Sequence, residues 1–130
     1  MIPLPTETAT PTSGTIALTN YYVSNPSART GQTVAVVYTI DNGTGHTARV
    51  MLGASIKSKR VADWGLGAIS DPEHDVVAIA PPGISTHLRY FTIASNLRPG
   101  SYDVGWGLRD AASGRAIAFL AAQGALRVSR

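Results

Sequence analysis

The sequence concentrates its polar chemistry in one short segment, SDPEHD, at positions 70–75. Asp71, Glu73 and Asp75 place three carboxylates at alternate positions of a proline-containing loop. Carboxylate oxygens are ligands for Ca²⁺, which takes about six to eight oxygens from side chains, carbonyls and water. The segment lacks the central glycine and the closing glutamate of the helical calcium-binding loop. A solvated turn, a calcium site and a catalytic pair of carboxylates are all open at this point. Ca²⁺ is the single candidate ion for a chain otherwise expected to need no cofactor.

The other reactive side chains form no familiar catalytic constellation. His46, His74 and His87 are the three histidines, and none stands two or four residues from another, as zinc ligands on one element often do. No serine lies in a Gly-x-Ser-x-Gly turn, and neither glycine-rich phosphate-binding motif occurs. The chain has no cysteine, which excludes disulfides, thiol catalysis and Cys-ligated zinc. We therefore expect a protein that is not an enzyme.

Aromatic side chains offer a second chemistry, because exposed rings serve as stacking platforms for sugars. Trp64 lies in VADWGLG beside Asp63, so it either faces solvent or folds over an open edge of the structure. Tyr21 and Tyr22 are consecutive, so on a strand one of them must point away from the core. Trp64, Tyr21 and Tyr22 are the candidate ligand-binding residues.

Two glycines in SYDVGWGLR, Gly105 and Gly107, alternate with large apolar residues. On a strand, this spacing leaves an outward strip without side chains, where another backbone or a flat ring can approach. The alternative is that a bulky residue of a neighbouring strand, or the linker, fills the strip.

Composition and charge narrow the class of protein. The chain has 130 residues, 44% of them hydrophobic and 15% charged, with thirteen glycines and eight prolines, which fits one domain rich in strands and turns. Eleven Lys and Arg against eight Asp and Glu give a net charge of +3, too sparsely distributed for a nucleic-acid footprint. No apolar run reaches the roughly 18 residues of a membrane span, so no membrane insertion is expected.

The chain divides into a tail and a folded unit. Residues 1–14, MIPLPTETATPTSG, are rich in Thr and Pro and predict a flexible linker, and residues 15–130 predict the folded domain. Within the domain, runs of β-branched and aromatic residues alternate with Gly, Pro, Asn and Asp clusters. The predicted strands are 15–24, 33–41, 48–57, 75–80, 85–94, 101–109 and 116–128.

Alternation within these runs predicts which residues face the core. In 101–109, Tyr102, Val104, Trp106 and Leu108 share one face, which places Trp106 in the core. In 85–94 the apolar residues fall on both faces, which predicts a bulge or burial on both sides. The loops 41–46 and 110–115 predict hairpins, and 58–74 and 80–83 predict crossings between sheets. Seven strands joined in this way indicate a Greek-key β-sandwich.

Two segments resemble parts of known β-sandwich modules. NLRPGSYDVGWGLRD at 96–110 resembles the penultimate strand of immunoglobulin-like and fibronectin-like sandwiches, in which the Tyr hydroxyl, here that of Tyr102, bonds a nearby backbone group. ARTGQTVAVVYTIDNGTGHTARV at 28–50 is similar to the opening of extracellular modules of the CARDB group, the cell-adhesion-related domains of bacteria. The resemblance spans about residues 15–130 and implies an immunoglobulin-like fold without fixed catalytic residues.

The resemblance and the residues together give an expectation of function. We expect a non-catalytic accessory, spacer or adhesion module of a larger bacterial protein, secreted or at the cell surface. Its expected partners are other domains of the parent protein, with a polysaccharide, a protein or a second copy of the chain as further candidates. The alternative is a carbohydrate-binding accessory module that uses its exposed aromatic residues.

Overall fold

The computed structural model describes residues 15–61, 64 and 68–130, and it is built almost wholly of strands. The predicted linker, residues 1–14, lies outside the described residues. The elements are β1 (Ile16–Val23), β2 (Ser27–Arg29), β3 (Thr33–Asn42), β4 (Ala48–Ser58), β5 (Ile69–Ser70), the short 3-10 helix η1 (Pro72–His74), β6 (Val76–Ala80), β7 (Gly83–Thr92), β8 (Gly100–Asp110) and β9 (Ala116–Ser129).

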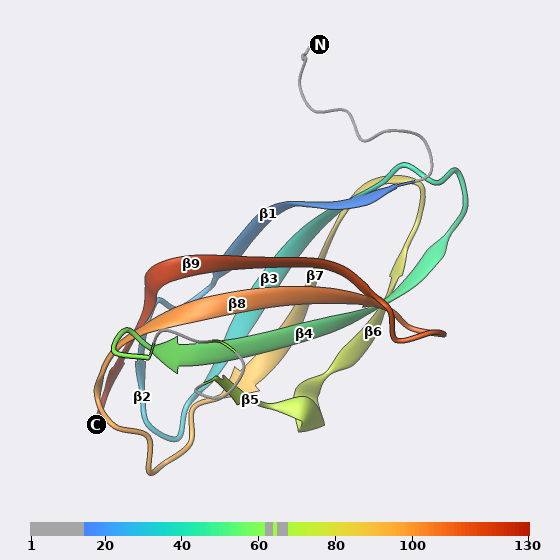
Figure 1. Ribbon diagram of the computed structural model, residues 1–130. Coiled ribbons are helices and arrows are strands. Elements are labelled where there is room, and N and C mark those ends of the chain that lie inside the picture. The colour runs from blue at the N-terminus through green and yellow to red at the C-terminus, as the bar shows by residue number, and fades with distance from the viewer. Residues whose placement is uncertain (1–14, 62–63, 65–67) are drawn as a thin grey trace.

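The strands form two sheets that pack face to face (Figure 1). Sheet A has the order β1-β3-β7 and is antiparallel. Sheet B has the order β2-β9-β8-β4-β5, and β6 pairs directly with another stretch of β4, from Ala48 to Leu52. The all-β sandwich predicted from the sequence is confirmed, and each of the seven predicted runs coincides with a strand. The short strands β2 and β5 were not expected, because runs of two or three residues carry no periodic signal.

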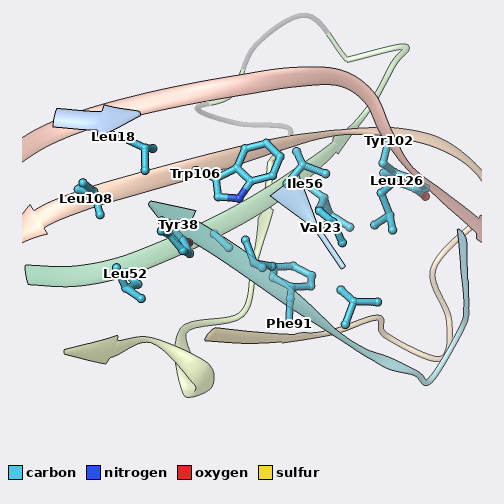
Figure 2. Close-up of a cluster of buried hydrophobic side chains, with 14 of the residues drawn as sticks. Leu18, Val23, Tyr38, Leu52, Ile56, Phe91, Tyr102, Trp106, Leu108 and Leu126 are labelled. Atoms are coloured by element: carbon cyan, nitrogen blue, oxygen red, sulfur yellow. The ribbon is translucent and has the colours of Figure 1, made fainter. Parts of the chain in front are cut away.

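Side chains from both sheets fill the core between them. Trp106 on β8 and Tyr38 on β3 point into the space between the sheets, as Figure 2 shows. Successive side chains of a strand point to opposite faces of the sheet. In β3 and β8, the apolar residues that fall on the face toward the other sheet are buried and form this core. The predicted burial of Trp106 is confirmed, and its ring packs on Tyr21 with the centroids 5.0 Å apart.

Two predictions about connections are wrong. The loop 41–46 does not close a hairpin, because β3 belongs to sheet A whereas β4 belongs to sheet B. The segment 58–74 does not change sheets, since both β4 and β6 lie in sheet B. Residues such as Asn and Gly indicate that a chain can turn, but they do not specify which strand the next one pairs with. The hairpin at 110–115 is confirmed by the pairing of β8 with β9.

The expectation for 85–94 is also wrong. The pairing of β7 with β3 runs without a register shift from Thr33↔Thr92 to Asn42↔Gly83. Phe91 and Ile93 face the core, while Leu88 and Tyr90 lie on the outer face of sheet A and are exposed. Neither a bulge nor burial on both sides accounts for the mixed pattern. The apolar residues fall on both faces of β7 because the outer face of sheet A also carries apolar side chains, and these are exposed.

Candidate functional site

The outer face of sheet B carries a groove of about 300 Å³, which we call the glycine groove. Gly53 of β4 and Gly107 of β8 pair directly across the sheet and leave the floor without side chains. One wall is Phe119 of β9, and the other wall is the segment 70–75 with Asp75. The residues that line the groove are Met51, Gly53, Ala54, Ser55, Ser70, Pro72, Asp75, Gly107, Arg109 and Phe119.

Strand alternation explains why these residues share one surface. Leu52 of β4 and Leu108 of β8 are fully buried in the core, so Gly53 and Gly107 beside them must face outward. Phe119 is the cross-strand partner of Gly107 and therefore lies on the same outer face. Phe119 is 51% exposed. The groove thus combines a side-chain-free floor with a partly exposed aromatic ring.

The two glycines of β8 play different parts. A Cβ added at Gly105 would lie 2.5 Å from Cζ of Phe119, so the phenyl ring occupies the space above this glycine. A Cβ added at Gly107 would meet nothing closer than the Gly53 carbonyl oxygen at 3.8 Å. Both alternatives drawn from the sequence are therefore realised: a bulky neighbour covers Gly105, and open space remains over Gly107.

Trp64 supports the aromatic wall. It is half-buried, and its ring meets Phe119 edge to face, with the centroids 5.4 Å apart and the planes at 74°. The ammonium nitrogen of Lys57 lies 5.2 Å from the centroid of the indole, within the range of a cation–π contact. Of the two placements considered from the sequence, the folded-over one is observed. Trp64 does not line the groove, but it packs against Phe119, which does.

Beneath Trp64 lies a buried ion pair. Lys57 Nζ is 2.8 Å from Asp103 Oδ2, and both side chains are only 9% exposed. Lys57 also donates to the carbonyl of Val61, and the backbone N–H of Gly124 donates to Asp103. Burial would raise the pKa of Asp103, but the hydrogen bonds from Lys57 and Gly124, with the charges of Lys57 and Lys59, lower it on balance. The pair holds the start of the segment after β4 over the outer face of sheet B.

The second wall of the groove is fixed by Arg89. This fully buried guanidinium on β7 donates to the Asp75 carboxylate and to the Asp71 carbonyl. Asp71 in turn accepts hydrogen bonds from His74 Nδ1, at 2.7 Å, and from the backbone N–H of Thr92, at 2.8 Å. The arrangement ties the segment 71–75 to sheet A.

The candidate calcium ligands therefore have protein partners. Asp71 and Asp75 are engaged by His74, Thr92 and Arg89, whereas Glu73 is exposed on η1. Among residues 15–61, 64 and 68–130, no three His, Cys, Asp or Glu side chains gather in a metal-binding group. Calcium binding at Asp71, Glu73 and Asp75 stays a prediction from the sequence.

The two candidate tyrosines lie on opposite faces of sheet A. Tyr21 is half-buried on Trp106, so it belongs to the core side of sheet A. Tyr22 is 49% exposed and lies on the outer face of sheet A, level with Val37 and Leu88. The glycine groove is on the opposite side of the sandwich. The structure does not bring Tyr22 and Trp64 together.

The three histidines lie in different parts of the chain, and none of them lines the glycine groove. His87 Nε2 lies 2.7 Å from Ser85 Oγ on the same strand, and burial lowers the pKa of the imidazole. Neither residue borders the glycine groove. His46 lies in the loop between β3 and β4, far along the chain from His74 on η1.

Of the ten residues that line the groove, the sequence reasoning singled out Asp75 and Gly107 and missed the other eight, among them Gly53, Arg109 and Phe119. Phe119 carried a usable signal, because alternation along AIAFLAA places it opposite the glycine strip once β9 is paired with β8. The pairing of β4 with β8, which brings Gly53 beside Gly107, is a long-range choice that local sequence does not encode.

Comparison with known proteins gives a likeness of fold. No protein-family model and no curated protein matches the chain. A Niemann-Pick type C2 protein from the Japanese carpenter ant is 12% identical with a TM-score of 0.57, over 91% of this chain and 96% of that chain. At such identity the likeness shows the fold alone.

Other similar structures are parts of longer enzymes. The alkylpurine DNA glycosylase AlkC of Pseudomonas fluorescens, solved bound to DNA containing an abasic site analogue, is 12% identical with a TM-score of 0.54, over 91% of this chain and 31% of that one. A β-glucuronidase of Bacteroides uniformis is 15% identical with a TM-score of 0.53, over 78% of this chain and 12% of that one. This chain thus spans under a third of either enzyme. In the described part of the chain, no helix is long and apolar enough to cross a membrane.

Proposed function

We propose that this chain is a non-catalytic, carbohydrate-binding accessory module of a larger secreted or cell-surface protein, and that a sugar ring occupies the glycine groove. One observation carries the proposal: the partly exposed ring of Phe119 forms a wall beside an open floor made of Gly53 and Gly107. Binding sites for small ligands combine apolar walls with a few placed polar groups, and the volume of the groove falls at the small end of their range.

The groove offers both kinds of contact that a sugar needs. The C–H face of a pyranose ring can pack on Phe119, whose position is held by Trp64. Hydroxyl groups of the sugar can bond to Arg109, Asp75 and Ser55 at the rim. Asp75 is already paired with Arg89, so it accepts hydrogen bonds from a fixed position.

The residues around the groove favour binding over catalysis. Hydrolysis of a glycosidic bond ordinarily needs two carboxyl groups on either side of the bond, one of them able to donate a proton. Among the residues that the structure describes, Asp75 is the one carboxylate that lines the groove, and it already forms an ion pair with Arg89. The Ser85–His87 pair lies away from it.

The accessory role is supported by the setting in which similar folds occur. In the DNA glycosylase and the β-glucuronidase, the matching region is a minor part of a longer enzyme. The Thr- and Pro-rich composition of residues 1–14 is typical of tethers between modules. Both features favour an accessory domain, which holds its ligand close to a neighbouring domain of the same protein.

Affinity gel electrophoresis with neutral polysaccharides embedded in the gel tests the proposal. We expect at least one polysaccharide to retard the protein and Phe119→Ala to abolish the retardation. Tyr22→Ala removes an exposed ring from the opposite face and serves as the matched control, with migration like that of the wild type. If no polysaccharide of a broad plant and bacterial panel retards the protein, or if Phe119→Ala binds as the wild type does, the proposal is wrong.

A second candidate is adhesion through self-association, which the outer face of sheet A favours. Four large apolar side chains are exposed there: Tyr22, Ile84, Leu88 and Tyr90. The face carries one acidic residue, Asp41, so two identical faces can meet without strong like-charge repulsion. Sedimentation equilibrium tests this candidate. It predicts dimers that Leu88→Lys disperses, and a wild-type monomer at all accessible concentrations contradicts it.

A further inference from the structure

A second pocket opens at the end of the sandwich where β4 finishes and β8 begins. Figure 1 shows the turn after β4 and the turn before β8 at this same end, together with the C-terminus. The pocket has a volume of about 610 Å³ and shares no lining residue with the glycine groove. It is lined by Ser58, Lys59, Arg60, Arg98, Pro99, Gly100, Ser101 and Tyr102.

The pocket gathers positive charge from three segments. Lys59 and Arg60 follow β4, and Arg98 precedes β8. Arg127 of β9 is the cross-strand partner of Ser101, so a fourth cation stands beside the pocket. All four side chains belong to exposed residues. Like charges brought together at one end repel one another unless an anion lies between them.

No carboxylate compensates this cluster within the described part of the chain. None of the four cations forms an ion pair there, and no Asp or Glu lines the pocket. Asp103 is close enough for Lys59 to help lower its pKa, but its carboxylate is already bonded to Lys57 and to the Gly124 N–H. The charge of the pocket is therefore open to an external anion.

The backbone around the cations is held in place. The Tyr102 hydroxyl donates to the Arg98 carbonyl at 2.5 Å, and Pro99 fixes its own φ and restricts the backbone of the preceding Arg98. On the other side, the Ser58 hydroxyl oxygen accepts a hydrogen bond from the Arg60 N–H. The Ser58 hydroxyl can therefore still donate its own hydrogen toward a ligand. Guanidinium groups on a fixed loop suit the oxygens of phosphate or sulfate, which they bind in a bidentate manner.

We propose that this pocket binds an oxyanion group, a phosphate or a sulfate, either free or carried as an ester on a polysaccharide. The site is separate from the glycine groove and does not depend on sugar binding there. Arg60 and Arg98 supply the paired donors, Lys59 and Arg127 supply further charge, and Ser58 supplies a neutral donor.

Nuclear magnetic resonance titration with sodium sulfate tests the site, with sodium chloride used to keep the ionic strength constant. We expect saturable shifts of the amides of Arg60, Gly100 and Ser101. The double variant Arg60→Gln/Arg98→Gln is expected to weaken sulfate binding at least tenfold. Arg49→Gln/Arg115→Gln removes the same charge from exposed positions elsewhere on the chain and is expected to change binding less than twofold.

The titrations distinguish binding at this pocket from general attraction by net charge. Equal losses in the two double variants, or shifts of similar size at every basic residue, would mean that net charge alone attracts the anion and would overturn the proposal. Dextran sulfate with unmodified dextran as control identifies the source. Tighter binding of dextran sulfate than of free sulfate, lost in Arg60→Gln/Arg98→Gln, assigns a polymer-borne ester. Equal affinities assign the free anion. Phe119→Ala leaves this pocket intact, so a failure here is distinct from a failure at the glycine groove.

Discussion

The hydroxyl of Tyr38 reaches across the core and donates a hydrogen bond to the carbonyl of Gly53. Tyr38 belongs to sheet A and is fully buried, whereas Gly53 belongs to sheet B and floors the glycine groove. One polar contact thus links the inner face of one sheet to the backbone beneath the proposed sugar site. Burial strongly raises the pKa of the phenol, which keeps the hydroxyl protonated and able to donate.

Tyr38→Phe removes this hydrogen bond while keeping the ring that fills the core. We expect the free energy of unfolding to fall by about 1–2 kcal/mol, because the Gly53 carbonyl is left without this donor. Urea denaturation measures the change. Tyr90→Phe, which removes an exposed hydroxyl, is the control and is expected to stay within about 0.5 kcal/mol of the wild type. Equal stability of Tyr38→Phe and the wild type would contradict the importance of this contact.

Tyr102→Phe tests the corner that the sequence predicted. The observed hydrogen bond from the Tyr102 hydroxyl to the Arg98 carbonyl confirms that prediction. Its loss is expected to lower the free energy of unfolding by roughly 1–2 kcal/mol, and a thermal melt beside Tyr90→Phe measures it. A neutral result would show that the loop before β8 holds its shape without the hydroxyl.

The success and the failure of sequence reasoning have different physical origins. Trp106 and Tyr102 were placed correctly because alternation and a Pro-Gly turn are local signals that the fold obeys. The loop 41–46 was assigned to a hairpin because its composition permits a tight turn, yet β3 and β4 lie in different sheets. The pairing of strands that are distant in the sequence depends on how the whole core packs. It therefore cannot be predicted from any single segment.

The same distinction applies to the site. Gly105 and Gly107 indicated a strip without side chains, and the strip exists. The walls of the strip are distant from these glycines in the sequence. One wall is Phe119, which follows Gly107 by 12 residues, and the other contains Asp75, which is held by Arg89 of sheet A. The sequence left open whether Trp64 faces solvent or folds over the structure, and it could not name Phe119 as the ring that Trp64 contacts. Local sequence therefore located the floor of the groove, whereas its walls depend on tertiary contacts.

Gly105→Ala and Gly107→Ala form a matched pair on the two sides of the phenyl ring. The methyl group at position 105 would lie 2.5 Å from Phe119 Cζ, so the ring must move and lose its contact with Trp64. At position 107 the nearest atom is 3.8 Å away, an ordinary contact distance. We expect Gly105→Ala to shift the Trp64 fluorescence and Gly107→Ala to leave it unchanged. The buried Trp106 gives a constant background, and Trp64→Phe assigns the signal. Identical spectra for the two variants would contradict the position of Phe119.

A double-mutant cycle measures the buried ion pair of Lys57 and Asp103. Lys57→Met leaves a carboxylate with little exposure and no countercharge, and we expect a loss of roughly 3–5 kcal/mol in the free energy of unfolding. Lys57→Met/Asp103→Leu is expected to lose less than the sum of the two single variants, with a residual cost of about 1–3 kcal/mol because the Gly124 N–H loses its acceptor. Arg49→Met, at an exposed position away from Asp103, is the control. Additive losses in the cycle would show that the two charges do not interact.

The same ion pair predicts how stability depends on pH. The pKa of Asp103 in the folded protein lies below its ordinary value of 3.8, so the folded state favours the ionised form. This stabilisation is fully present above the ordinary value and is lost as the pH falls through it and below, because the unfolded chain takes up the proton first. Between pH 6 and pH 3, the wild type is therefore expected to lose more stability than Asp103→Asn, which has no proton to bind at this site. Guanidinium denaturation at both pH values measures the difference, and parallel losses in the two proteins would place the acid sensitivity elsewhere.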